Sequence, residues 1–192
     1  KFDKAVLVEE GTTNVWVYSD PTNLAQLNVY GNVSIAAAGS VDARFAGGVV
    51  FGDNSVVRYA YKTPSLSVNT DYVLSAYIKM DDGSQPVPGT DFRFVLAGNA
   101  FTPTKVELVS GTLYRVWGQY TTPSSISVSN TGIIKYTTSS PKSFKVSGFQ
   151  VEQKSYATSY MPTSGAPSTR SPETLTIPGS VLNPQEGAVE CW

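Results

Sequence analysis

The sequence predicts an all-β fold in which two antiparallel sheets pack face to face, as a sandwich or a jelly roll. Short segments with alternating apolar and polar residues recur along the 192-residue chain, and clusters of Gly, Pro, Asn and Asp separate them. No segment sustains the 3.6-residue apolar period of an amphipathic helix. Since parallel βαβ units need such helices between strands, an α/β fold is excluded.

The expected strands, in chain order, cover residues 4–9, 15–18, 33–38, 49–51, 56–62, 71–80, 92–96, 105–109, 113–121, 125–128, 132–136 and 143–152, with residues 11–14 as a turn. The segment 71–80 has the clearest alternation. One face carries Tyr72, Leu74, Ala76 and Ile78, and the other carries Val73, Ser75, Tyr77 and Lys79. We expect the first face to lie in the core.

The last expected strand contains a change of phase. Its apolar alternation shifts at Ser147-Gly148, and a lone glycine inside a strand pattern indicates a β-bulge. After Glu152 the alternation stops, and a Ser/Thr-rich segment with Tyr156 and Tyr160 runs to Pro162. We expect this segment to lie as a strap across the last strand.

Composition excludes several classes of function. The chain has no histidine, which removes Ser-His and Cys-His nucleophile pairs and His-ligated metal sites, and it has no glycine-rich phosphate loop. Charged residues are only 15%, against roughly 25% in ordinary soluble proteins. With a net charge of −1 and no basic cluster, we expect no nucleic-acid binding, and without a long apolar run no membrane insertion. The lone Cys191 has no intramolecular disulfide partner.

We expect three parts in the chain: a lead-in segment (residues 1–14), a β-sandwich module (15–162) and a Pro/Ser/Thr-rich linker that ends in a truncated start of a further domain (163–192). Residues 187–192 begin a new strand pattern and stop within it. The chain is therefore expected to be a fragment of a longer protein.

Three stretches resemble known families. Phe149-Gln150-Val151-Glu152, followed by Tyr156-Ala157-Thr158-Ser159-Tyr160-Met161-Pro162-Thr163, resembles the closing signature of a β-sandwich module in bacteriophage tail and other virion proteins. Those modules are similar to the jelly-roll carbohydrate-binding modules of glycoside hydrolases. Residues 5–14 are similar to a stretch that precedes such modules, and residues 174–178 with 183–190 resemble the entry to a laminin-G/concanavalin-like domain. The resemblance implies a carbohydrate-binding-module-like jelly roll on the virion surface, without catalytic activity.

A sugar-binding face would need aromatic rings that stack on pyranose rings, beside polar groups that bind hydroxyls. If Tyr72 and its alternates point into the core, Tyr77 and Lys79 point outward. We expect Tyr77 and Trp117 to form the central pair. The other candidates for the same sheet face are Lys79, Arg115, Tyr59 and Tyr61. Each of these tyrosines could instead be an ordinary core or surface residue, and Trp117 could equally lie in the core. Tyr156 and Tyr160 are expected to fasten the strap.

The carboxylates are interpreted more conservatively. Asp81 and Asp82, with Asp91 across a loop, could form a glycosidase acid/base pair or a calcium site, but adjacent aspartates after a strand are more typical of a solvated turn. Because many related jelly rolls carry a structural calcium ion, the resemblance implies that Glu9, Glu10, Asp20 or Glu152 could ligate one. We assign no metal ligands and expect no other cofactor.

Two functions from different classes remain open. One is non-catalytic binding of host-envelope glycans by a virion surface protein, in which many copies strengthen a weak single site. The other is a structural module for virion decoration or for tail or capsid assembly, which binds other virion proteins or copies of itself. An exposed aromatic platform on a sheet face would favour glycan binding, and an apolar patch would favour assembly. A glycoside hydrolase is a distant third, because it needs two carboxylates in a cleft.

Overall fold

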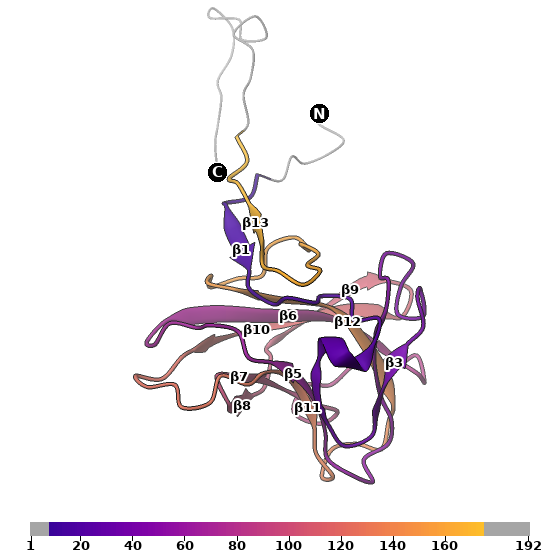
Figure 1. Cartoon of the computed structure of the whole chain (residues 1–192). Helices are drawn as coiled ribbons and strands as arrows, with labels where there is room; N and C mark the ends of the chain where they lie inside the picture. Colours follow the sequence, from indigo (N-terminus) through magenta and orange to yellow (C-terminus); the bar gives the residue numbers. More distant parts are fainter. Residues whose placement is uncertain (1–7, 175–192) are drawn as a thin grey trace, which may run out of the picture.

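The computed structural model describes residues 8–174, which form thirteen strands and one three-residue 3-10 turn, η1 (Leu24–Gln26). Figure 1 shows two sheets stacked as layers, with a small two-stranded ribbon standing above the upper layer. The ribbon consists of β1 (Thr12–Asn14) and β13 (Ser168–Arg170). Within this range no helix has the length and hydrophobicity that crossing a bilayer requires.

The strand order of the two sheets defines a jelly roll. The six-stranded sheet runs β3 (Val33–Ala36), β4 (Gly48–Phe51), β12 (Phe144–Glu152), β6 (Asp71–Met80), β10 (Leu113–Thr121), β9 (Lys105–Ser110). The five-stranded sheet runs β2 (Asn28–Tyr30), β5 (Arg58–Lys62), β11 (Thr131–Lys135), β7 (Arg93–Leu96), β8 (Asn99–Phe101). All neighbours are antiparallel, and from β4 to β7 and again from β10 to β12 the chain changes sheet at every step. The predicted antiparallel two-sheet sandwich is thus confirmed.

The core lies between the two sheets. Tyr72, Leu74, Ala76 and Ile78 of β6 point into it and are buried, as their alternation predicts. Stacked aromatic pairs fill the space between the layers, with ring centroids 4.7 Å apart for Trp16 and Phe149 and 4.9 Å for Phe51 and Phe144. The two-residue period of the central strands therefore predicts which of their side chains lie in the core.

The expected and observed strands agree best in the long central segments. Residues 71–80 and 113–121 match β6 and β10 at both ends. Residues 15–18 and 125–128 form no strand, and the expected turn at 11–14 contains β1. Three short strands, β2, β8 and β13, were not predicted from the sequence. Most of the expected strand 4–9, the pattern at 187–192, the laminin-G-like segments and Cys191 lie outside the described residues.

The short strand β1 is stabilised by contacts with residues that are distant in the sequence. It pairs with β13 from Thr12 opposite Arg170 to Asn14 opposite Ser168. The buried Asn14 side chain donates to the carbonyls of Phe149 and Met161 and accepts from the Val151 backbone N–H. These bonds join the first strand to the last strand and the strap, which no local pattern around residue 14 reveals.

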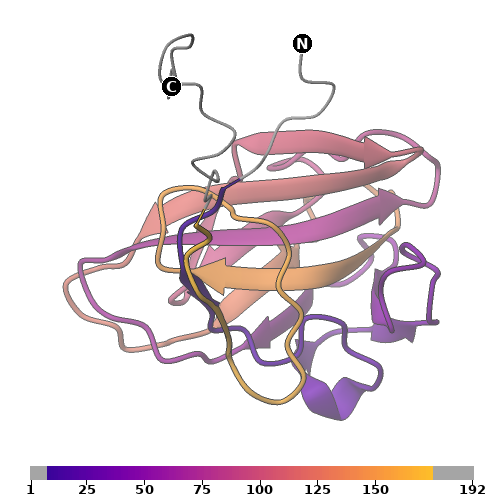
Figure 2. The same ribbon diagram turned by 90° about the horizontal axis from the view of Figure 1, so that it is seen from above.

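The expected bulge and strap are both present. The register of β12 against β6 shifts between Ser147 and Gln150, and Gly148 has φ +61°. Residues 153–167 then pass over the outer face of the six-stranded sheet (Figure 2). The Gln150 side chain holds this strap by donating to the Ser159 carbonyl and accepting from the Met161 N–H.

Candidate functional site

The structure divides the predicted sugar-binding residues between the two sheets. In the register of β10 and β6, Arg115 lies opposite Tyr77, Trp117 opposite Ser75 and Leu113 opposite Lys79. Tyr77, Lys79, Arg115 and Trp117 therefore share the outer face of the six-stranded sheet, as expected. Tyr59 and Tyr61 belong to β5 in the other sheet, so the prediction that they line the same face is wrong. The reason is the jelly-roll winding, which places consecutive strands such as β5 and β6 in opposite layers.

Tyr77 points outward from its sheet but is covered. Its side chain is only 5% exposed, beneath the rings of Phe45 at 5.1 Å and Tyr160 at 5.8 Å. The guanidinium groups of Arg44 and Arg115 each lie 5.5 Å from the centre of its ring. Tyr77 is thus a packing residue beneath the strap, with no ring face open to a ligand in this arrangement.

The other three residues on this face have different surroundings. Arg115 donates to the Ser75 hydroxyl and the Thr158 carbonyl, which ties the strap to the sheet. Trp117 is half-buried, and its Nε1 donates to the Glu107 carboxylate at 3.1 Å. Lys79 borders a polar hollow of about 330 Å³ beside the β9–β10 turn. These side chains do not form a continuous aromatic platform.

The strap is fastened by a half-buried acid, Asp20. The Tyr160 hydroxyl donates to Asp20, which also accepts from the Ser147 hydroxyl. Burial raises the pKa of Asp20 above its usual value, although these hydrogen bonds act in the opposite direction. The role expected for Tyr160 in the strap is confirmed, whereas the Tyr156 side chain is exposed.

An aromatic surface covers the opposite side of the molecule. On the five-stranded sheet Ala60, Ile133 and Phe94 are fully buried, so their neighbours along each strand face outward. The register places four outward side chains in one row across four strands: Tyr30, Tyr59, Ile134 and Arg93. At about 4.8 Å between strands, this row spans roughly 14 Å. We call Tyr30, Tyr59, Tyr61, Tyr136 and Arg93 the tyrosine face.

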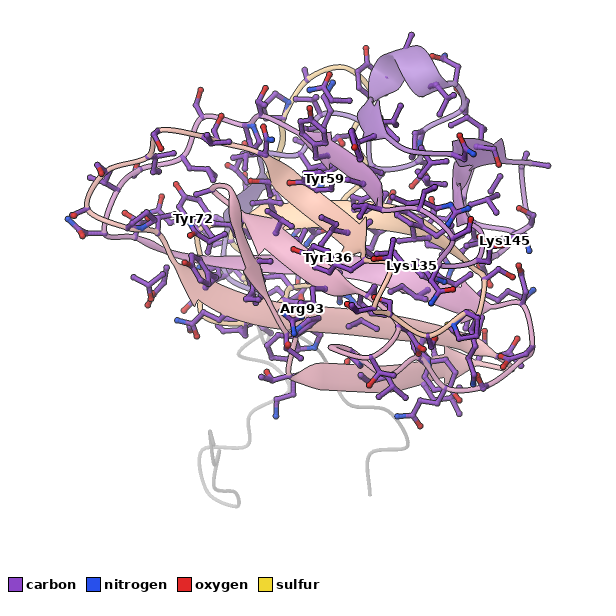
Figure 3. The ribbon with its side chains drawn as sticks, turned by 90° about the horizontal axis from the view of Figure 1, so that it is seen from below. Tyr59, Tyr72, Arg93, Lys135, Tyr136 and Lys145 are labelled. Carbon is purple, nitrogen blue, oxygen red and sulfur yellow. The ribbon has the colours of Figure 1, made fainter. Side chains whose placement is uncertain are left out.

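The rings of this face pack against one another. The centroids of Tyr59 and Tyr61 are 4.4 Å apart and their planes meet at 23°, so the two rings stack and each covers part of one face of the other. Figure 3 views the sheet from outside and shows Tyr59, Tyr136 and Arg93 in sequence across its middle. The Tyr30 side chain, at the edge strand, is 65% exposed.

A polar hollow adjoins the rings. It has a volume of about 230 Å³, and it is lined by Gly89, Arg93, Tyr136, Thr138 and Ser139. The Tyr59 hydroxyl is enclosed and has no hydrogen-bond partner among residues 8–174. Burial, with smaller effects of Tyr61 and Tyr136, raises the pKa of Tyr59, so this phenol stays neutral. Stacked rings beside a polar hollow can hold a ring with an apolar face and hydroxyl edges.

Sequence reasoning missed three members of this face. Tyr30 lies in β2, which has no clear alternation, and Tyr136 directly follows β11. Arg93 alternates with the buried Phe92 and Phe94, so the sequence predicts that its side chain points outward. The sequence does not predict to which of the two sheets the strand belongs. Sequence alone did not show which strands lie side by side.

The candidate acid/base residues are engaged in a turn. Asp81 pairs with Lys145 and accepts from Ser143, and Asp82 pairs with Lys142. The Ser84 hydroxyl and backbone N–H, with Lys142, lower the pKa of Asp82 to about 2. A glycosidase needs one carboxylic acid with a raised pKa, so these residues fit the interpretation as a solvated turn.

The candidate calcium ligands are also bonded to side chains of the protein. Glu9 pairs with Arg170, Glu10 pairs with Lys154, and Glu152 accepts from Gln150 and Thr158. Across residues 8–174 no group of three or more His, Cys, Asp or Glu side chains is arranged to hold a metal ion. A structural calcium ion stays a prediction from the family resemblance.

No protein-family model matches the sequence, and no curated protein matches it. Among solved structures, the chain is similar to a protein described as "Family 16 Carbohydrate Binding Module-2", at 14% identity and a TM-score of 0.46 over 72% of this chain and 99% of that one. It is also similar to the CBM22-1 xylan-binding domain of Paenibacillus barcinonensis Xyn10C, at 15% identity and a TM-score of 0.47 over 76% and 94%. The C-terminal family 22 carbohydrate-binding module of Clostridium thermocellum Xyn10B gives 10% identity and a TM-score of 0.49 over 76% and 96%. Because these TM-scores lie below 0.5, the jelly-roll assignment rests on this chain's own strand order.

Proposed function

We propose that this chain is a non-catalytic glycan-binding module and that the tyrosine face is its sugar platform. The observation that carries the proposal is the stacked pair of Tyr59 and Tyr61 in a sheet face that continues into the polar hollow at Arg93 and Tyr136. Pyranose rings present an apolar face that packs on aromatic rings, and their hydroxyls need nearby polar groups. The row of outward side chains, roughly 14 Å long, leaves room for more than one sugar ring.

The biological setting is a separate part of the proposal. The sequence resemblances at residues 149–163 and 5–14 support the proposal of a virion surface protein that adheres to the host envelope. In that setting many copies would act together, so a weak single site would suffice.

The test is binding to a glycan array and to purified cell-wall polysaccharides. Tyr61→Ala and Tyr30→Ala are the test variants, and Tyr156→Ala is the matched control because that tyrosine is exposed on the strap. We expect saturable binding by the wild type, a loss of roughly tenfold or more in Tyr61→Ala, and no change in Tyr156→Ala. Full affinity in both test variants would refute this site, and the absence of any binding would refute the function.

One observation favours the second candidate function, assembly with other proteins. The edge strand β9 of the six-stranded sheet exposes Leu108 by 61% and Val109 by 38%. An edge strand also has unpaired backbone N–H and C=O groups, which another chain can bind. If this strand is an interface, light scattering should show an oligomer for the wild type and a monomer for Leu108→Lys. Monomers at every concentration for both proteins would remove this alternative for self-association.

A further inference from the structure

The five-stranded sheet is cationic although the chain as a whole is not. Its five strands contain four basic residues and no Asp or Glu: Arg58, Lys62, Arg93 and Lys135. The six-stranded sheet has Asp71, Glu107 and Glu152 among its strand residues, and the net charge of the chain is −1. Of these four residues, only Arg93 lies on the tyrosine face, because Arg58, Lys62 and Lys135 are in register with the inward Ala60 and Ile133.

Arg93 differs from every other arginine in the chain. Arg44, Arg58 and Arg170 form ion pairs with Asp42, Asp53 and Glu9, and Arg115 donates to Ser75 and to the Thr158 carbonyl. For the guanidinium of Arg93, no ion pair or hydrogen bond occurs with any residue from 8 to 174, and the side chain is exposed. It lines the hollow together with Tyr136, Thr138 and Ser139. An unpaired guanidinium in a polar hollow is a suitable partner for an oxyanion.

No carboxylate among residues 8–174 forms an ion pair with the Arg93 guanidinium. Asp91 lies two residues before Arg93, but it is only 2% exposed, and its carboxylate accepts from the Val87 N–H and the Ser140 hydroxyl. Lys135 is fully buried, and its ammonium group donates to the carbonyls of Gly52 and Lys142 rather than to a carboxylate. Figure 3 shows Lys135 beside Tyr136. Lys135 is in phase with the inward Ile133, and the Asp91 carboxylate interacts with it as an opposite charge, so Lys135 does not belong to the tyrosine face.

We propose that the tyrosine face binds an acidic glycan, with Arg93 holding a carboxylate or sulfate group of one sugar while the tyrosine rings stack on a neighbouring sugar. The inference rests on the proposed function and names its ligand class. A planar guanidinium can bind either oxyanion through two parallel N–H donors. The hydroxyls of Thr138 and Ser139 can bind the remaining sugar hydroxyls. Neutral glycans would bind only through stacking and hydroxyl contacts.

The test compares polymers that differ only in charge. Affinities are measured by calorimetry for polygalacturonate against its methyl-esterified form, and for dextran sulfate against dextran, with an oligothymidylate as the nucleic-acid comparison. The variants are Arg93→Gln, Tyr61→Ala and the control Lys105→Gln, which removes another exposed charge, from β9, with no ion pair within the described range. The two polymer pairs separate a carboxylate ligand from a sulfate ligand.

We expect at least one acidic polymer to bind about fivefold to tenfold more tightly than its neutral form, with the preference falling as salt rises. Arg93→Gln should abolish the preference, so that this variant binds the acidic and neutral forms with equal affinity, and Lys105→Gln should leave the wild-type preference unchanged. Equal binding of acidic and neutral forms, or a preference that survives Arg93→Gln, would overturn the inference and leave glycan binding intact. Oligothymidylate binding as tight as that of the acidic polymer would overturn it in favour of nucleic acid. If no polymer binds at all, the proposed function itself fails.

Discussion

Replacement of Gly148 by alanine tests the packing of Tyr77 and Phe45 against the bulge of β12. Gly148 lies in the bulge of β12 with φ +61°, a left-handed conformation that costs an alanine roughly 1–2 kcal/mol. A Cβ atom there would lie 2.6 Å from Cδ2 of Tyr77 and 2.9 Å from Cε1 of Phe45. Since both rings are buried, neither can move freely aside. Overpacking of this kind costs typically 1–3 kcal/mol.

Gly111 provides a matched control for the backbone strain. It has φ +54° in the β9–β10 turn, and a Cβ atom built on it meets nothing within 4 Å. Gly111→Ala should therefore lose only the conformational contribution. We expect Gly148→Ala to lower the free energy of unfolding by about 2–5 kcal/mol, which exceeds the loss in Gly111→Ala by about 1–3 kcal/mol.

Urea denaturation followed by tryptophan fluorescence measures both variants, and thermal unfolding gives a second value. In a domain of this size each kcal/mol shifts Tm by about 2–4 °C. Equal destabilisation of the two alanine variants would refute the reasoning, because it would mean that Tyr77 and Phe45 do not pack against the bulge.

Three further predictions concern buried polar and aromatic groups. Asn14→Ala should destabilise the protein by about 2–4 kcal/mol in urea denaturation, because it leaves buried backbone groups of the last strand and the strap unpaired. Full stability would show that these bonds contribute nothing. Burial, with Arg58 nearby, lowers the pKa of Lys135, so the unfolded chain holds that proton more tightly and wild-type stability should rise with pH as Lys135 titrates below its unfolded value of about 10.5. A pH series should show this rise in the wild type and not in Lys135→Met, and a rise of the same size in the variant would contradict the assignment. Tyr77→Ala should lose about 3 kcal/mol of stability, and the folded variant should keep its glycan affinity. A loss of binding in the folded variant would indicate that the glycan site lies on the six-stranded sheet instead.

The long central strands were predictable because their signal is local. In β6 every second side chain enters the core, so the two-residue period marks both the strand and its buried face. The bulge at Gly148 was also visible, because a lone glycine interrupts the period there. The short strands β1, β2 and β13 carry no such signal, since each has only three residues and depends on a distant partner.

In the candidate site, too, local features were predictable from the sequence and contacts between distant segments were not. The sequence predicted that the side chains of Tyr77 and Lys79 point away from the core, and the structure agrees. It did not predict that Phe45 and Tyr160 cover Tyr77. It also suggested Tyr59 and Tyr61 as ligand residues, on a face to which they do not belong. Coverage and sheet membership both arise from contacts between segments far apart in the chain.

The sequence by itself determined the fold class, the main strands, the bulge and the absence of histidine chemistry, because each depends on residue type or on short-range period. Only the tertiary structure decided which strands are neighbours, which outward faces are covered, and that Tyr59, Tyr136 and Arg93 share one face. The physical reason is that a jelly roll assembles its sheets from strands that are not consecutive, so the composition of a face is fixed by long-range pairing rather than by local pattern.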